Sequence, residues 1–108
     1  MESVEPLSKE ELSAIERRVA AASPGPWVGW MESRHGIGGT SFIQLSADAD
    51  EDDEIYLTRV TGGREVIGAD AQTDADIEFI AGARQDMPRL INEIRRLRAA
   101  LKRAHPAD

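Results

Sequence analysis

Arginine and tryptophan are the residues of this sequence whose chemistry points most directly to a ligand. Eleven of the 13 basic residues are arginine, and six of those lie between positions 84 and 103. Guanidinium groups pair with phosphate oxygens in a bidentate manner, and aromatic rings stack on bases. The arginines fit either a solvated helix face or an anion site formed where that face meets a sheet or a second subunit. The candidate ligand-binding residues are Arg84, Arg89, Arg95, Arg96, Trp27 and Trp30.

Arg84 stands apart because the sequence places it at a short junction between two predicted helices. An arginine there either hydrogen-bonds to the last carbonyls of the first helix or binds an anion with little loss of side-chain entropy. Trp27 and Trp30 are three residues apart in a predicted strand, so their side chains point to opposite faces. One is expected in the core, and the other is exposed or covers an interface or a ligand.

No pattern in the sequence predicts a metal site. The sequence has no cysteine, and its only histidines, His35 and His105, have no partners at a metal-binding spacing. The acidic stretch from Asp48 departs from the calcium-binding EF-hand loop, because its sixth and twelfth positions are Asp53 and Arg59 instead of glycine and glutamate. We therefore expect a solvated loop over residues 47–54.

No pattern predicts catalysis either. The glycines at 36–39 lead into Thr40-Ser41 and a strand, whereas a phosphate-binding P-loop continues with lysine, Ser/Thr and a helix. This segment is either a plain turn or a backbone contact to a ligand. No spacing supports a Ser-His-Asp arrangement. We therefore expect no catalytic residue, no cofactor and no enzyme activity, with a hydrolase as the less favoured alternative.

Charge is distributed unevenly along the chain. Residues 1–79 carry 17 acids and six bases, whereas residues 80–108 carry three acids and seven bases, and the net charge is −7. A protein this acidic is repelled by duplex DNA, so no duplex nucleic acid is expected as a partner. No apolar run approaches the roughly 20 residues of a membrane span, and the acidic N-terminus does not resemble a secretory signal. The expected compartment is the cytoplasm, which is the host cytoplasm if the protein is phage-encoded.

The elements that position these residues form one expected α+β domain over residues 1–108, with a flexible arm at 1–7 and a frayed tail at 104–108. Ser8 and Glu11 have capping-box spacing, and apolar positions at 12, 15, 19 and 22 continue a helix until residues 23–26 stop it. Strands are expected at 27–33, 41–46, 55–60 and 65–67, with Phe42 facing inward and a hairpin turn at Gly62-Gly63. They form a small antiparallel meander of three or four strands.

Two C-terminal helices complete the predicted fold. The first covers residues 74–83 and is capped by Thr73 or Asp74, and the second begins after Asp86. The second helix carries apolar residues at heptad spacing, which suits either packing on the sheet or self-association. We expect a homo-oligomer, and its interface residues are Leu90, Ile94, Leu97 and Leu101.

Two stretches, ASPGPW at 22–27 and DIEFIAGARQDMP at 76–88, together resemble a group of small uncharacterised proteins of bacteriophages, prophages and actinobacteria. In size and predicted layout the chain is also similar to phage anti-Thoeris sponges, which sequester cyclic nucleotide immune signals without cleaving them. This resemblance implies a counter-defence protein that binds a small phosphorylated ligand of the cyclic nucleotide or ADP-ribose type. The alternative is a phage or prophage adaptor that binds a host protein through an acidic sheet face.

Overall fold

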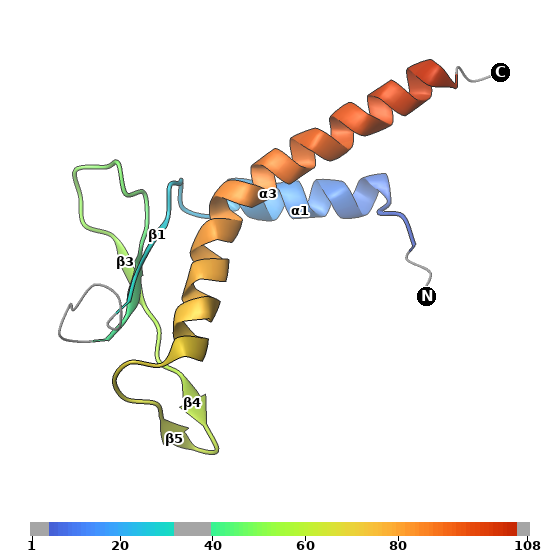
Figure 1. The fold of residues 1–108 in the computed structure, drawn as a ribbon. Coiled ribbons are helices and arrows are strands. Elements are labelled where there is room, and N and C mark those ends of the chain that lie inside the picture. Colours follow the sequence, from blue (N-terminus) through green and yellow to red (C-terminus); the bar gives the residue numbers. More distant parts are fainter. Residues whose placement is uncertain (1–4, 32–39, 106–108) are drawn as a thin grey trace. The chain divides into compact units, whose positions relative to one another are not determined.

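The computed structural model describes residues 5–31 and 40–105 and divides the chain into two compact units (Figure 1). One unit comprises residues 1–22 and 86–108, and the other comprises residues 23–85. The architecture is α+β, with an N-terminal helix and a small antiparallel sheet as the sequence predicts, and it ends in one long C-terminal helix. Several of the sequence predictions concern residues outside the described ranges. They are the turn at 36–39, His35, the end of the first strand, residues 1–4 of the arm and residues 106–108 of the tail.

Helix α1 (Lys9–Ala21) begins where the capping box predicts. The Glu11 N–H donates to Ser8 Oγ at 3.0 Å, and the Ser8 N–H donates to Glu11 Oε1 at 2.8 Å. The bond from the Ser8 N–H is the main reason that the pKa of Glu11 lies below its ordinary value, and the Ser8 hydroxyl adds to it. The helix ends at the C-cap Ala22, directly before the Ser-Pro-Gly-Pro segment, so both predicted ends are confirmed.

Strands β1 (Val28–Trp30), β2 (Phe42–Gln44) and β3 (Glu54–Tyr56) form an antiparallel sheet in that order. The predicted fourth strand instead belongs to a separate hairpin of β4 (Val60–Thr61) and β5 (Arg64–Glu65). Gly62 and Gly63 have φ angles of 58° and 78° in its turn, a conformation that glycine adopts without strain. The predicted hairpin turn is therefore confirmed, although its strands do not extend the main sheet.

The two predicted C-terminal helices are one continuous helix, α3 (Ala71–Ala104). Pro88 lies inside it and removes one main-chain hydrogen bond, the one that residue 88 would donate to the Arg84 carbonyl. The prediction of a junction here is wrong, and Arg84 lies within a helix. Apolar residues are buried on both sides of the proline, among them Ala81 and Ile91, and such packing offsets the roughly 3 kcal/mol that an internal proline costs.

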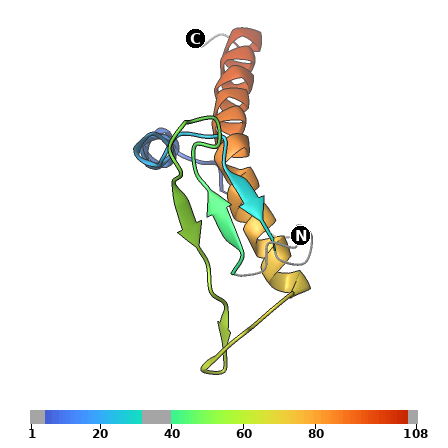
Figure 2. The same cartoon turned by 90° about the vertical axis from the view of Figure 1, so that its left-hand side faces the viewer.

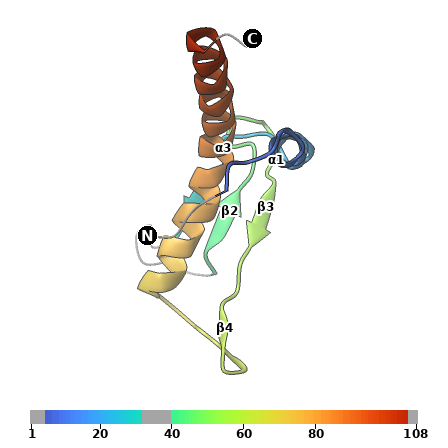
Figure 3. The ribbon, with the colours of Figure 1, turned by 90° about the vertical axis from the view of Figure 1, so that its right-hand side faces the viewer.

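The core of the 23–85 unit lies between the sheet and the first part of α3, which Figures 2 and 3 show against one face of the three strands. Ile43 and Ile77 are each 1% exposed, and Trp27 and Leu57 pack at the edge of this cluster. Gly29 permits the close approach, because a Cβ at this position would lie 2.8 Å from Ile77 Cγ2. The remaining buried members of the cluster are Met31, Leu45 and Ala81.

Candidate functional site

The face of the sheet opposite the core is the main candidate surface. Side chains alternate along a strand, so residues two apart share a face. Gly29 and Ile43 face α3, and their neighbours in each strand therefore point the other way. Within the 23–85 unit, no helix covers that side in Figure 2. This surface, called the outer face below, consists of Val28, Trp30, Phe42, Gln44, Glu54 and Tyr56.

Three aromatic rings cross the outer face in one row. Trp30 is the direct partner of Phe42, and Phe42 is the direct partner of Tyr56. The ring centroids lie 6.5 Å apart in the first pair and 5.0 Å apart in the second, with interplanar angles of 21° and 29°. Trp30 and Phe42 are half-buried, whereas Tyr56 is 59% exposed. The aromatic row therefore presents stacked rings from all three strands.

A polar row beside the rings holds two of them in place. Trp30 Nε1 donates to Gln44 Oε1 at 3.0 Å, and the Tyr56 hydroxyl donates to Glu54 Oε2 at 2.7 Å. The bond to the Glu54 carboxylate favours the protonated phenol, which raises the pKa of Tyr56 above its ordinary value. The carboxylate thus lies at the edge of the aromatic row and gives it a negative border.

Phe42 does not occupy the core position that the sequence predicts. Ile43 points inward at 1% exposed, and Phe42 faces outward between the other two rings. Ile43 and Leu45 are two positions apart and both are buried, so they share the inner face, whereas Phe42 shares the outer face with Gln44. Alternation over residues 42–45 therefore favours Ile43 as the inward residue, and the inward prediction for Phe42 is wrong.

The loop between β2 and β3 adds further negative charge. Acidic residues occupy positions 48 and 50–53, and all five are exposed. The loop is held at its ends, because the Leu45 N–H donates to the Asp53 carbonyl and the Ala47 N–H donates to the Pro26 carbonyl. Among residues 5–31 and 40–105, no group of three or more His, Asp or Glu side chains is arranged to hold a metal ion.

The predicted ligand-binding arginines beyond residue 85 are largely paired with carboxylates. Arg95 Nη2 lies 2.7 Å from Glu16 Oε1, and Arg96 forms an ion pair with Glu93. The Arg96 pair lowers the pKa of Glu93 below its ordinary value, chiefly through the hydrogen bonds from the guanidinium. Arg89 is exposed and lines a shallow hollow with Asp86, Leu90 and Glu93. An anion would therefore compete with the carboxylates that already bind Arg95 and Arg96.

The two tryptophans that were predicted to bind a ligand lie on opposite faces of the sheet, as expected. Trp27 precedes β1 and packs against the core, and its Nε1 donates to the Ser23 carbonyl at 3.1 Å. Trp30 belongs to the aromatic row. Arg84, in the same unit as both, has an Nε that is buried and has no hydrogen-bond partner among the described residues.

Gln85 is a structural residue that sequence reasoning missed. Its Oε1 accepts the Trp27 N–H at 2.8 Å, and its Nε2 donates to the Trp27 carbonyl at 3.2 Å and to the Ala81 carbonyl at 3.1 Å. The side-chain amide therefore pairs with the main chain of Trp27 as a neighbouring strand would. The available signal was the joint occurrence of the two stretches at 22–27 and 76–88, which this amide connects.

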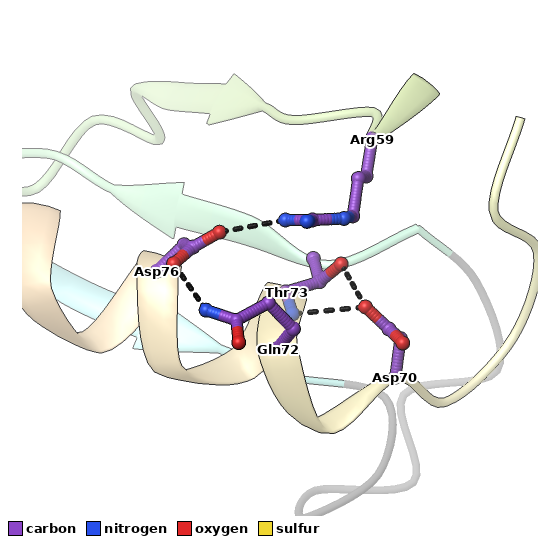
Figure 4. A network of polar contacts seen from close by, with 5 residues as sticks. All are labelled: Arg59, Asp70, Gln72, Thr73 and Asp76. Atoms are coloured by element: carbon purple, nitrogen blue, oxygen red, sulfur yellow. Dashed lines mark hydrogen bonds and ion pairs between the residues drawn. The ribbon is translucent and has the colours of Figure 1, made fainter. Parts of the chain in front are cut away.

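A second polar cluster lies at the start of α3, where Figure 4 shows Arg59, Asp76 and Gln72 linked by hydrogen bonds. The helix begins earlier than predicted, because Asp70 is its cap and not Thr73 or Asp74. Thr73 donates to Asp70 Oδ2 from its hydroxyl at 2.6 Å and from its N–H at 2.9 Å. An adjoining hollow of about 400 Å³ is lined by Arg59 and Glu65 among others, and Arg59 is already paired with Asp76.

The predicted oligomer interface is mostly exposed. Leu90, Leu97 and Leu101 are 55%, 52% and 62% exposed, and Ile94 is half-buried. The residue of this segment that is buried is Ile91, at 4%. Self-association through the exposed leucines stays a prediction.

Comparison with protein-family models, with curated proteins and with solved structures gave no match. In the part of the chain that the structure describes, no helix is both long and apolar enough to cross a membrane.

Proposed function

We propose that this protein is a non-catalytic binding module that holds a segment of another protein on the aromatic row. This is the adaptor interpretation of the sequence. The observation that supports it best is the row itself, in which Trp30, Phe42 and Tyr56 are stacked in register across three strands. Rigid aromatic side chains supply large contact areas at little entropic cost, and they dominate the energetics of protein interfaces.

The charges near the row favour a protein partner over a nucleic acid or a nucleotide. Proteins that stack bases on aromatic rings also track the phosphates with a basic groove. The outer face has one carboxylate and no basic residue, and the adjoining loop is acidic. Two of the four arginines that the nucleotide-sequestering hypothesis names, Arg95 and Arg96, are paired with Glu16 and Glu93.

We also propose that copies of the chain associate through the C-terminal part of α3. Leucines at 90, 97 and 101 have half or more of their surface exposed, and their heptad spacing suits helix pairing. Association would present several outer faces at once, which strengthens the binding of a repetitive partner.

The proposed function is tested by selecting peptides from a random library on the immobilised protein and measuring their affinity by calorimetry. Tyr56→Ala removes the most exposed ring of the row, and we expect it to weaken the selected peptides about tenfold or more. Phe79→Ala is the matched control, because Phe79 is 76% exposed on α3 within the same unit but lies outside the outer face.

Failure to enrich any peptide, or equal affinity for wild type and Tyr56→Ala, would overturn the proposal. A parallel titration with cyclic nucleotides and ADP-ribose covers the competing hypothesis. Binding of either ligand that is lost in Arg84→Ala but kept in Tyr56→Ala would establish nucleotide sequestration instead.

A further inference from the structure

We infer that the partner segment is basic and extended, with arginine or lysine beside proline or another apolar residue. This inference depends on the proposed function and names its partner class. The outer face combines flat rings with a border of negative charge, and both features suit a cationic segment.

The rings contribute an attraction for cations as well as apolar contact. The face of an aromatic ring carries negative electrostatic potential, so a guanidinium or ammonium group stacks on it favourably. Tyr56 is the ring with the most exposed surface, and its hydroxyl is bonded to the Glu54 carboxylate. A cation on this ring therefore lies near a fixed negative charge.

Negative charge at one end of the sheet strengthens this attraction for cations. Val28, Gln44 and Glu54 form the row of the outer face next to the β2–β3 loop, and the aromatic row lies one step further along the strands. The loop carries five exposed carboxylates at positions 48 and 50–53, directly before Glu54. A segment on the rings that continues toward the loop meets acidic groups, so a basic segment is attracted and an acidic one is repelled.

Proline is the apolar residue that best fits such a surface. Proline-rich segments are already extended before binding, so they lose little entropy when they dock on aromatic rings. An alternating Pro-Arg sequence therefore offers both a flat ring and a cation at regular spacing.

The test uses a fluorescein-labelled peptide of six Pro-Arg repeats, with Pro-Gln and Pro-Glu repeats of the same length and a labelled oligothymidylate. Fluorescence anisotropy is measured with the full chain at two salt concentrations. We expect the Pro-Arg peptide to bind most tightly, the Pro-Glu peptide not to bind, and the affinity for Pro-Arg to fall with added salt.

Two charge variants with equal net charge separate local from global attraction. Asp50→Asn combined with Asp52→Asn neutralises the loop, and Glu5→Gln combined with Glu10→Gln removes the same charge from exposed positions at the N-terminus and in α1. We expect the loop variant to bind Pro-Arg several-fold more weakly and the control to bind as wild type does. Tyr56→Ala is expected to weaken binding about tenfold.

The outcomes distinguish this inference from the proposed function. If the Pro-Gln and Pro-Arg peptides bind with equal affinity and both lose binding in Tyr56→Ala, the basic partner is overturned. The proposed function, a peptide-binding outer face, is then kept. Pro-Arg binding that Tyr56→Ala does not change is charge attraction alone and overturns the inference. Binding of oligothymidylate in preference to every peptide overturns both. The absence of binding to all four probes overturns the basic partner, whereas the proposed function is decided by the library selection.

Discussion

Asp70 fixes the first turn of α3 with its carboxylate, which accepts two hydrogen bonds from Thr73. The bond from the Thr73 hydroxyl is the largest cause of a pKa below the ordinary value for Asp70, and the Thr73 N–H is the second. The unfolded chain has neither bond. The stabilisation is therefore complete above the ordinary pKa of about 3.9 and is lost as the pH falls through the lower folded-state pKa.

Asp70→Asn should remove this pH dependence. Asparagine caps a helix about as well as aspartate but does not titrate, so we expect similar melting temperatures for both proteins at neutral pH. Between about pH 4 and pH 2 the wild type should lose more stability than the variant. Thermal unfolding followed by circular dichroism checks this, and parallel curves for the two proteins would contradict it.

Gly29 lies where the sheet approaches α3 too closely to leave room for a side chain. We expect Gly29→Ala to cost about 1–3 kcal/mol, because the new methyl would overlap Ile77 Cγ2 in a packed core. Ile77→Leu moves the side-chain branch away from Cβ and so relieves the overlap. The double variant should therefore lose less unfolding free energy than the sum of the losses of the two single variants. Urea denaturation of the four proteins measures this coupling, and simple additivity would mean that the clash is relieved elsewhere.

At the scale of elements, the segment before β1 is joined to α3 and to the chain after β2. Gln85 of α3 pairs with the Trp27 main chain. After β2, the Ser46 hydroxyl donates to the Pro24 carbonyl at 2.8 Å. The Ala47 N–H likewise donates to the Pro26 carbonyl at 2.8 Å. These bonds fix the point at which the chain enters β1. They therefore help to set the register that places Trp30 on the outer face.

Gln85→Glu tests this connection with little change in size. A carboxylate still accepts the Trp27 N–H but does not donate to the Trp27 and Ala81 carbonyls, so oxygen atoms would face each other. We expect a loss of about 1 kcal/mol or more in the free energy of unfolding, together with faster hydrogen exchange near Trp27. Gln85→Met is the size-matched control, which removes the bonds without adding charge and should cost less.

At the scale of the whole molecule, the chain combines an acidic sheet loop with a basic C-terminal helix segment. The difference is large, with a net charge of −11 over residues 1–79 and +4 over residues 80–108. The acidic part includes the outer face and its loop, and the basic part includes the exposed leucines of α3. We therefore propose that partner binding and self-association use different parts of the chain.

Leu97→Asp should disrupt self-association, because it places a charge in the middle of the apolar positions that pair. We expect the wild type to sediment as a concentration-dependent oligomer at tens of micromolar and the variant to sediment as a monomer. Ala99→Asp adds the same charge at an exposed position of the same helix outside the heptad positions, and it should sediment as the wild type does. A wild type that is monomeric throughout would refute the interface.

Local signals in the sequence were sufficient for several features. The capping box at Ser8 and Glu11, the end of α1 before Pro24 and the turn at Gly62-Gly63 were all predicted correctly. Each depends on interactions among residues a few positions apart, so the sequence contains all the relevant partners. The opposite faces of Trp27 and Trp30 follow from strand alternation in the same way.

Three features were decided only by the tertiary structure. Phe42 stacks between Trp30 and Tyr56 of the two neighbouring strands, and α3 continues through Pro88 because apolar residues on both sides of it are buried. Gln85 pairs with Trp27 across a separation of 58 residues. In each case the deciding partner is distant in sequence, so no pattern of neighbouring residues contains it. The aromatic row exists for the same reason, because its three rings come from three strands that only the folded sheet brings into register.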